Sequence, residues 1–335
     1  MINFKKYLLD DLAKPLFFRK NEKIINHSKK SKAKYYIIFR SPGAGMFSNI
    51  NYILNQVKYA IKHKLIPIID MENFTTIYNE SEKINNTNNA WEYYFYQFSN
   101  VNLKKIYKSG NYILSKREYL KKFINRLDAD REIINLFRKI KLKKKILKEV
   151  NLFVKKKFKD EKKILGVHLR STSYKKAKNH AFPPSPKIMC EEINRLIEKY
   201  NYKKIFFVTE DEGYLRYFKK KYNKNLIFYN CFRSKNNEAF KIYPRKKHRY
   251  KLGKEIIIET LLLSRCAGIL FTVSNISSAA SMLTKKEIRL HEINLGYNSS
   301  NKYISRWLWY VKSMLPKFFG GLKIKSRIDK KIKFN

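Results

Sequence analysis

The chain has 335 residues, with 74 lysines and arginines against 27 aspartates and glutamates, which gives a formal net charge of +47. The length suits two domains, and 44% hydrophobic with 15% aromatic residues is ample for packed cores. These proportions exclude a disordered basic tail, which would be poor in aromatic and β-branched residues. Two explanations of the charge stay open: the residue bias of an AT-rich genome, or selection for an anionic partner such as nucleic acid, an acidic membrane surface or a phosphorylated substrate.

The cysteines and the apolar segments indicate a cytoplasmic protein. The three cysteines lie far apart without a CxxC pair, which predicts neither a disulfide framework nor a zinc site. Charges run through the short apolar stretch of residues 1–20, so no signal peptide is expected. The most apolar window, residues 256–273, is interrupted by Glu259 and Arg265, so no transmembrane helix is expected either.

In the first part of the chain, a strand, a glycine turn, a helix and a second strand follow one another. This order predicts a β-α-β unit, whose strands lie parallel in one sheet. A basic, partly helical arm is expected before it (1–34) and a basic helical connector after it (131–158). The elements of the unit are expected at residues 35–39 (strand), 49–64 (helix) and 65–70 (strand).

A second alternation of strands and helices begins after the connector. Strands are expected at 164–169, 205–209, 226–229 and 268–273, and helices at 187–200, 212–222 and 254–265. We therefore predict an α/β protein with two Rossmann-like domains and a cleft between them. Their predicted limits are an arm at 1–34, an N-terminal domain with its connector at 35–158, a C-terminal domain at 159–290 and a basic aromatic tail at 291–335.

Open parallel sheets bind ligands beyond the carboxyl ends of their strands, so the residues that follow each strand are the candidates. After the first strand, Gly43-Ala44-Gly45 leads to Asn49 in a helix. Small residues and helix N-terminal amides favour a bound anion. A tight turn capped by Asn49 explains the same residues equally well.

The next strand ends in His168 and Arg170, which point to the same face of the sheet. A guanidinium at the rim can grip a phosphate at two points. The alternative is a buried, hydrogen-bonded histidine and an arginine paired with a carboxylate.

Two further strand ends carry polar residues. Glu210-Asp211-Glu212 is a plausible helix cap and also offers acceptors for ribose or base donors. Acidic residues are favoured in the first turn of a helix, which supports the cap. Ser274-Asn275-Ile276-Ser277 offers hydroxyls and amides to a phosphate, or a plain helix cap.

Taken in order, these segments resemble the fucosyltransferase superfamily, which includes the nodulation and core α-1,6-fucosyltransferases and the protein O-fucosyltransferases, and in particular related bacterial surface-glycan glycosyltransferases. GVHLRSTSY is similar to the family's GVHxRxTDx strand end, and the GMFSN segment that begins at Gly45 to the GRFGN loop. IFFVTEDEGYLRYFKKKY, KEIIIETLLLSRCAGILFTVSNISSAA and NAWEYYF also have counterparts, so the likeness covers about residues 35–285.

This resemblance implies a GT-B fold and a metal-independent, inverting transfer from a nucleotide sugar, most often GDP-fucose, without a cofactor. The implied acceptor is a glycan, either free or lipid-linked. Arg170 matches the arginine that stabilises the leaving phosphate. The other positions that the resemblance assigns to donor binding are Gly45, Asn49, His168, Asp211, Glu259, Ser274, Asn275 and Ser277.

The family usually carries aspartate three residues after this arginine, where this chain has Ser173. The difference leaves open the donor sugar, the acceptor geometry and activity itself, so a catalytically silent homologue is an alternative. His180 lies near a position where related bacterial sequences often have His-Pro. We expect it to be the general base, with a simple substrate contact as the alternative.

Other signals are set aside. Asp128-Ala-Asp130 precedes a helical pattern and is interpreted as a helix cap rather than a metal-binding DxD. No histidine, cysteine and carboxylate cluster has the spacing of metal ligands. A basic nucleic-acid-binding protein remains an alternative, but its signature motifs are absent, so no nucleic-acid partner is predicted.

The C-terminal segment carries an apolar stripe formed by Ile304, Trp307, Leu308, Val311 and Leu315, followed by two phenylalanines and a lysine-rich end. Aromatic residues beside lysines suit the headgroup boundary of an anionic membrane. This predicts a peripheral location at the inner face of the plasma membrane. The alternative is that the stripe packs back onto the N-terminal domain as a core helix.

Overall fold

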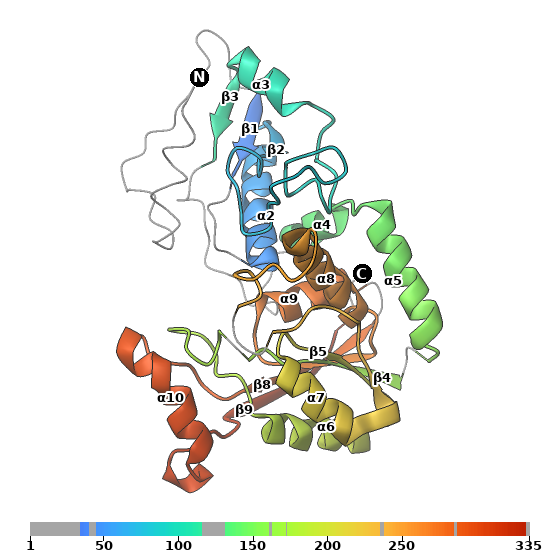
Figure 1. The fold of residues 1–335 in the computed structure, drawn as a ribbon, viewed down its shortest axis with the longest axis vertical. Coiled ribbons are helices and arrows are strands. Elements are labelled where there is room, and N and C mark those ends of the chain that lie inside the picture. Colours follow the sequence, from blue (N-terminus) through green and yellow to red (C-terminus); the bar gives the residue numbers. More distant parts are fainter. Residues whose placement is uncertain are drawn as a thin grey trace. The chain divides into compact units, whose positions relative to one another are not determined.

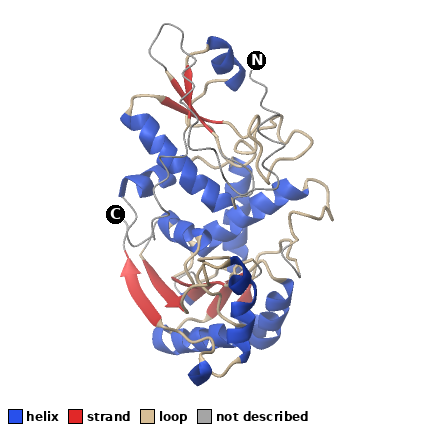
Figure 2. Ribbon diagram, turned by 90° about the vertical axis from the view of Figure 1, so that its left-hand side faces the viewer, coloured by secondary structure: helices blue, strands red, loops and turns tan. Residues whose placement is uncertain are grey.

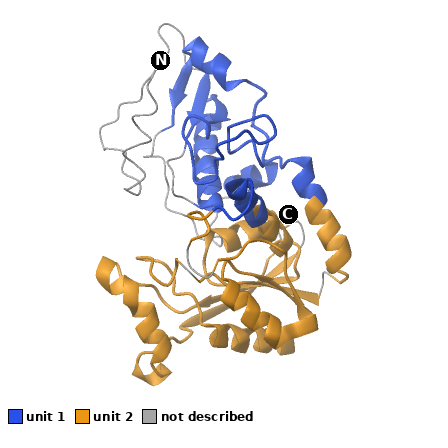
Figure 3. Ribbon diagram, viewed as in Figure 1, with its two compact units in different colours: residues 1–148, 243–256 blue, residues 149–242, 257–335 orange. Residues whose placement is uncertain are grey.

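A computed structural model describes residues 34–39, 45–115, 131–160, 163–171, 173–234, 238–284 and 287–332. Most of the predicted basic arm and the Asp128-Ala-Asp130 segment lie outside these residues. The chain divides into two compact units, shown in Figure 3: residues 1–148 with 243–256, and residues 149–242 with 257–335. The boundary falls inside a helix of the predicted connector, and the segment 243–256 returns to the first unit.

Unit 1 is built on a parallel three-stranded sheet with the order β2-β1-β3. Buried isoleucines of the first two strands form its core together with Ile106 and Tyr112. Helix α2 packs against α4, where the rings of Phe47 and Phe137 meet edge to face at 6.4 Å. The elements of this unit are β1 (Tyr35–Ile38), α2 (Met46–Lys62), β2 (Ile66–Ile69), α3 (Leu103–Ser109), β3 (Tyr112–Leu114) and α4 (Arg131–Lys139).

Two helices are shared between the units along the sequence. Helix α5 (Lys144–Lys157) runs from unit 1 into unit 2, and helix α8 (His248–Leu263) does the same later in the chain. The first turn of α8 is held within unit 1, where the Tyr250 N–H donates to Glu80 at 2.8 Å. This contact explains why residues 243–256 belong to unit 1, which sequence periodicity does not reveal.

Unit 2 contains a six-stranded sheet with the order β6-β5-β4-β7-β8-β9. All neighbouring strands are parallel except β8 and β9, which are antiparallel. Figure 1 shows α6 and α7 on one face of this sheet and α9 on the other, and Figure 2 shows the sheet with helices on both sides. The elements are β4 (Ile164–His168), α6 (Pro186–Tyr200), β5 (Lys204–Val208), α7 (Glu212–Tyr222), η4 (Asn223–Asn225), β6 (Leu226–Ile227), β7 (Gly268–Phe271), α9 (Asn275–Leu283), β8 (Ile288–Asn294), α10 (Lys302–Met314), η5 (Lys317–Phe319) and β9 (Ser326–Ile332).

The predicted strands and helices of both α/β halves are confirmed, with ends that shift by a few residues. The largest shift is at α8, which begins at His248 rather than at 254. The parallel sheets and the mixed α/β class are confirmed as well. Among the described helices, none combines the length and apolar character needed to span a bilayer.

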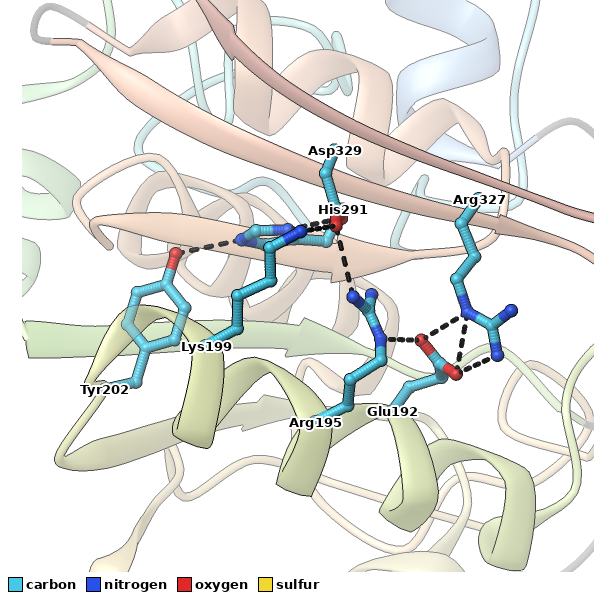
Figure 4. A network of polar contacts seen from close by, with 7 residues as sticks. All are labelled: Glu192, Arg195, Lys199, Tyr202, His291, Arg327 and Asp329. Atoms are coloured by element: carbon cyan, nitrogen blue, oxygen red, sulfur yellow. Dashed lines mark hydrogen bonds and ion pairs between the residues drawn. The ribbon is translucent and has the colours of Figure 1, made fainter.

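The C-terminal segment is part of the fold of unit 2, because β8 and β9 complete its sheet. Strand β9 is exposed along most of its length, so burial of apolar side chains contributes little to its position. Polar contacts hold it instead, as Figure 4 shows. Arg327 donates to Glu192 of α6 from Nη2 at 2.6 Å and from Nε at 3.0 Å. Arg195 bridges α6 to β9 by pairing with both Glu192 (2.8 Å) and Asp329 (3.2 Å).

His291 of β8 completes this network. Its Nδ1 lies 2.9 Å from Asp329, and its Nε2 lies 2.9 Å from the Tyr202 hydroxyl. Burial lowers the pKa of His291, so the ring is neutral near pH 7, with Nδ1–H donating to the carboxylate and Nε2 accepting from the tyrosine. Although burial opposes it, hydrogen bonding from His291 and Arg195 lowers the pKa of Asp329 to about 2. Near neutral pH, Asp329 is therefore negatively charged and His291 is uncharged.

Helix α10 packs on unit 2 through one face only. Ser305 and Trp309 are buried, and the Trp309 indole N–H donates to the Pro183 carbonyl at 2.8 Å. The predicted stripe lies mainly on the other side, because Ile304, Trp307, Val311 and Leu315 are exposed. Within unit 2, most of the stripe therefore lies outside the hydrophobic core, against which only its Leu308 packs.

Candidate functional site

The strand order of unit 2 contains a topological switch point. The chain begins at β4, adds β5 and β6 on one side, and returns to add β7 and β8 on the other. Open α/β sheets bind ligands at such a point, outside the carboxyl ends of the two strands that separate the halves. Here those strands are β4 and β7, and the polar residues predicted from the sequence follow both.

His168 ends β4 and Ser274 follows β7, and their side chains meet across the switch point. His168 Nδ1 lies 3.2 Å from Ser274 Oγ, and both residues are buried. The pKa of His168 is lowered to about 4, chiefly by burial; the Glu210 charge opposes this shift and the Arg170 charge adds to it. The imidazole is therefore neutral at pH 7 and acts as a hydrogen-bonding group rather than a cation.

Ser274 and Ser277 form a reciprocal cap at the start of α9. The Ser274 side chain accepts from the Ser277 N–H at 3.2 Å, and the Ser277 hydroxyl accepts from the Ser274 N–H at 3.1 Å. The cap interpretation of this turn is thus confirmed. Ser277 is fully buried, whereas Asn275 is half-buried in the first turn. That turn contains no acidic residue, so the positive end of the helix dipole is not offset there.

Arg170 lies two residues beyond the buried end of β4, and its side chain is 30% exposed. Its Nε lies 3.5 Å from Glu210 Oε1, its Nη2 donates to Ser173 at 3.4 Å, and its guanidinium lies 5.0 Å from the Tyr174 ring. These polar contacts are longer than the 2.7–2.9 Å typical of tight charge-assisted hydrogen bonds. Arg170 is therefore positioned by its neighbours without being tightly neutralised by them.

Glu210 lies at the end of β5 and connects the two strand ends. Its Oε1 accepts the Ser171 N–H at 2.9 Å. Although burial alone would raise the pKa of this carboxyl, the Arg170 guanidinium and the Ser171 N–H hold it below its ordinary value. Glu210 is thus an anion that orients Arg170 from one side.

Asp211 is held by the protein through both of its carboxylate oxygens. Oδ2 accepts from the buried Ser171 hydroxyl at 2.9 Å, and Oδ1 caps α7 by accepting the Tyr214 N–H at 3.0 Å. Asp211 therefore joins the ends of β4 and β5 and begins the next helix, as the first-turn interpretation predicted. Its contact with a donor stays a prediction.

Ser171, Tyr174 and Lys175 are residues of this site that the sequence reasoning missed. The Lys175 ammonium lies 4.8 Å from the Tyr214 ring and 4.7 Å from the Trp309 ring. Burial lowers the pKa of Lys175, while Asp211 and Glu210 oppose that shift. The only signal for these residues was their position in the segment directly after Arg170.

His180 is exposed on the same loop, and its ring meets the Tyr174 ring edge to face at 4.8 Å. Its Nδ1 lies 2.8 Å from the Lys178 carbonyl oxygen. Because a carbonyl can only accept, Nδ1 carries the proton in the neutral ring, and Nε2 keeps the lone pair. Tyr174 therefore contacts both Arg170 and His180, and it joins the two residues predicted to be catalytic.

Glu259 lies on α8 and is engaged by an arginine that the sequence reasoning did not identify. The buried Arg233 donates to Glu259 Oε1 at 2.6 Å and to the Cys231 carbonyl at 3.1 Å. The next residue, Ser234, donates its N–H to the Glu210 carbonyl at 3.1 Å. Arg233 therefore joins Glu259 of α8 to the loop that lies beside the end of β5. A direct role for Glu259 toward a donor stays a prediction.

Gly45 and Asn49 belong to unit 1, at the start of α2. Gly45 is the N-cap with extended backbone, and a Cβ added there would meet no protein atom within 4 Å. Neither packing nor backbone conformation thus requires glycine, which is compatible with the close approach of a ligand. Asn49 is buried in the first turn, where it lines a small cavity with Met46, Tyr78 and Trp91.

Within the described ranges, no group of three or more histidine, cysteine, aspartate or glutamate side chains is placed to hold a metal ion. The site in unit 2 contains cations instead, with Arg170 at the strand end and Lys175 on the following loop. An arrangement of fixed cations, a helix N-terminus and neutral hydroxyls suits a phosphorylated ligand.

No protein-family model matches the sequence, and no curated protein matches it. Among solved structures, the chain is similar to the NodZ α-1,6-fucosyltransferase soaked with GDP-fucose, at 16% identity over 77% of this chain and 94% of that chain, with a TM-score of 0.50. The fucosyltransferase NodZ from Bradyrhizobium matches at 14% identity over 77% and 95%, also with a TM-score of 0.50. The chain has the fold of these fucosyltransferases. The α/β, GT-B-like fold that the motifs implied is thus confirmed.

Proposed function

We propose that the chain is a fucosyltransferase-like glycosyltransferase that uses a GDP-type sugar donor, with GDP-fucose favoured. The proposed acceptor is a hydroxyl of a bacterial surface glycan such as lipopolysaccharide or capsule, modified in the cytoplasm at the inner face of the plasma membrane. Support for the donor comes from the fold shared with a fucosyltransferase that was soaked with GDP-fucose.

The observation that carries the proposal is the position of Arg170 beside the β4–β7 switch point. Its contacts with Glu210 and Ser173 are long, at 3.5 and 3.4 Å, so its positive charge remains available to an anion. The first turn of α9, which follows Ser274, adds a second positive region at the neighbouring strand end. Two such groups at adjacent strand ends match a diphosphate better than a single carboxylate.

The proposed reaction is an inverting displacement. The acceptor oxygen attacks the anomeric carbon, and the bond from that carbon to the β-phosphate oxygen breaks with its electron pair moving onto the phosphate. Arg170 stabilises the negative charge that grows there. His180 accepts the proton of the acceptor hydroxyl at Nε2, the nitrogen that holds the lone pair when Nδ1 donates to Lys178. No metal ion takes part in this scheme.

Ligand-dependent unfolding of the full chain tests the donor class. GDP should stabilise the protein, by about 2.7 kcal/mol at one hundred times its Kd, whereas a single-stranded oligonucleotide should not. Release of GDP or UDP from a panel of nucleotide sugars then identifies the donor. Stabilisation by the oligonucleotide alone would instead support a nucleic-acid-binding protein. Binding of GDP without turnover of any donor, with or without glycan acceptors, would identify a catalytically silent homologue.

A further inference from the structure

Helix α10 presents two different faces to its surroundings within unit 2. Ser305 and Trp309 are buried, whereas Trp307 is 70% and Met314 is 79% exposed. At 3.6 residues per turn, the exposed apolar residues of the helix fall within an arc of about 100° opposite the buried pair. The short helix η5 continues this surface with Phe318, which is 81% exposed. We call the following set the α10–η5 apolar face: Tyr303, Ile304, Trp307, Val311, Met314, Leu315, Phe318 and Phe319.

The segment that carries this face is strongly basic. Residues 302–325 contain no aspartate or glutamate. Its basic residues are Lys302, Arg306, Lys312, Lys317, Lys323 and Lys325. Large exposed apolar side chains surrounded by cations are the pattern of a surface that lies in the interface of an anionic bilayer.

We propose that the α10–η5 apolar face docks onto an anionic lipid surface, with its aromatic and aliphatic side chains at the headgroup boundary and its cations on the lipid phosphates. A second copy of the chain is a poorer occupant, because two such segments would bring like charges together. A single-stranded nucleic acid would stack on Trp307 and Phe318. Base stacking of this kind does not use the aliphatic side chains of Ile304, Val311 and Met314, which are exposed on the same face.

The surface is rigidly mounted, which favours docking as a unit. Lys312 fixes η5 by donating from Nζ to the Gly320 carbonyl at 2.8 Å and accepting the Leu322 N–H at its own carbonyl at 2.8 Å. Leu322 is buried in unit 2. Because η5 is tied back to the helix, Phe318 and Phe319 are held exposed beside the helical face instead of collapsing onto it.

The packed side of α10 contacts the loop that follows Arg170. The Lys175 ammonium lies 4.7 Å from the Trp309 ring, and Asn298 donates to the carbonyls of both Lys175 (3.2 Å) and Ser305 (2.9 Å). A bilayer bound to the exposed side would therefore lie close to the candidate site. If the proposed function holds, a bilayer in this position would bring a lipid-linked acceptor near the donor. The proposed lipid binding does not itself depend on the proposed function.

Tryptophan fluorescence tests the docking directly in the full-length protein. The chain has three tryptophans, of which Trp91 and Trp309 are buried and Trp307 is exposed. Vesicles of phosphatidylglycerol and phosphatidylcholine should shift the emission to shorter wavelength, and brominated acyl chains should quench it. Trp307→Phe should abolish the shift while retaining sedimentation with vesicles. Pure phosphatidylcholine vesicles, or anionic vesicles at high salt, should bind at least tenfold less protein.

Matched variants separate this surface from the general basicity of the chain. Phe318→Ser with Phe319→Ser should weaken vesicle binding at least tenfold, whereas Tyr217→Ser, an exposed aromatic on α7, should not. Lys302→Glu with Arg306→Glu should weaken it similarly. Lys220→Glu with Lys221→Glu makes the same change in net charge on α7 and should have a much smaller effect. Circular dichroism and the unfolding midpoint confirm that each variant is folded.

Three results would overturn the proposal. The first is equal binding to neutral and anionic vesicles, or equal effects of the patch and control variants. The second is a fluorescence shift with an oligonucleotide but not with vesicles. The third is emission from Trp307 that is already shifted in the free protein and reverts when Phe318→Ser disrupts a dimer. Because these measurements need no donor or acceptor, their failure is distinguishable from failure of the proposed glycosyl transfer.

Discussion

His168 Nδ1 and Ser274 Oγ lie 3.2 Å apart, so the ends of β4 and β7 are joined by a buried polar contact at the switch point. Ser274 also caps α9, which means that the neutral imidazole is linked to the helix start that faces the candidate site. The contact therefore couples the protonation of His168 to the geometry of both strand ends.

His168 should titrate far below an ordinary histidine. Its pKa is lowered from 6.5 to about 4, chiefly by burial. The unfolded chain therefore binds more protons than the folded protein between pH 6.5 and 4, and the free energy of unfolding should fall as the pH is lowered through this window. NMR of the imidazole should show no titration of His168 above pH 5. If His168 causes this pH dependence, His168→Gln should lose less stability than the unmodified protein between pH 6.5 and 4. Titration of His168 near pH 6.5 would contradict the prediction.

Arg170→Ala should lower transfer at least 100-fold while the fold remains intact, because a partly exposed guanidinium contributes little to the core and, in the proposed reaction, stabilises the leaving diphosphate. Arg170→Lys should also be severely impaired, since a single ammonium cannot reproduce the planar fork. The control is Arg216→Ala, because Arg216 is an exposed arginine of α7 that pairs with Glu212 of the same helix at 3.2 Å. Donor turnover and circular dichroism measure both properties. Near-normal turnover by folded Arg170→Ala protein would refute the assignment.

His180→Gln should reduce kcat by about 100-fold or more if the ring is the general base, because an amide cannot accept the acceptor proton. The loss should fall on transfer to the glycan and leave the Kd for GDP unchanged. His63→Gln provides the control, since His63 is an exposed histidine of unit 1. A rise in KM for the acceptor without a change in kcat would instead indicate a substrate contact.

Transfer should continue after chelation. In the proposed reaction, Arg170 and the start of α9 stabilise the charge of the leaving nucleotide, as a divalent ion does in metal-dependent enzymes. Activity measured after extensive treatment with EDTA should equal that of untreated protein. Loss of activity that manganese or magnesium restores would contradict the scheme and bring Asp128 and Asp130 back into consideration.

The sequence predicted most of the α/β elements, because short buried strands and capped helices leave local patterns. Strand β4, helix α7 and the Asp211 cap are examples. It did not predict β9, whose exposed sequence SRIDKKI lacks the alternation of a half-buried strand. Its position depends on pairing with Glu192, which lies 135 residues away in the chain. Contacts between residues so far apart in the chain produce no local periodicity in the sequence.

The candidate site was predictable to a similar extent. His168, Arg170 and Ser274 were identified because residues after parallel strands gather at one edge of the sheet. The engagement of Glu259 by Arg233, and of Asp211 by Ser171, was missed. Both partners come from irregular segments, where sequence spacing does not determine which side chains meet.

Arg327→Ala should weaken the attachment of β9 and lower the free energy of unfolding by about 2 kcal/mol, the usual scale for hydrogen bonds to a charged group. The Glu192 side chain is only 3% exposed, and it would lose its hydrogen bonds from Arg327 at 2.6 and 3.0 Å. Only its ion pair with Arg195 would remain of these contacts. Lys330→Ala, on the exposed side of the same strand, is the control and should change stability by less than about 0.5 kcal/mol.

Urea denaturation and hydrogen exchange of the β8 and β9 amides measure the effect of Arg327→Ala globally and locally. Burial opposes the shift, but Arg327 and Arg195 hold the pKa of Glu192 below its ordinary 4.5. The contribution of this carboxylate is therefore complete above pH 4.5 and is lost as the pH falls below that value. Arg327→Ala should accordingly reduce the loss of stability in acid as well as the stability at pH 7. Equal denaturation midpoints for Arg327→Ala and Lys330→Ala, with unchanged exchange in β9, would show that the pair does not hold the strand.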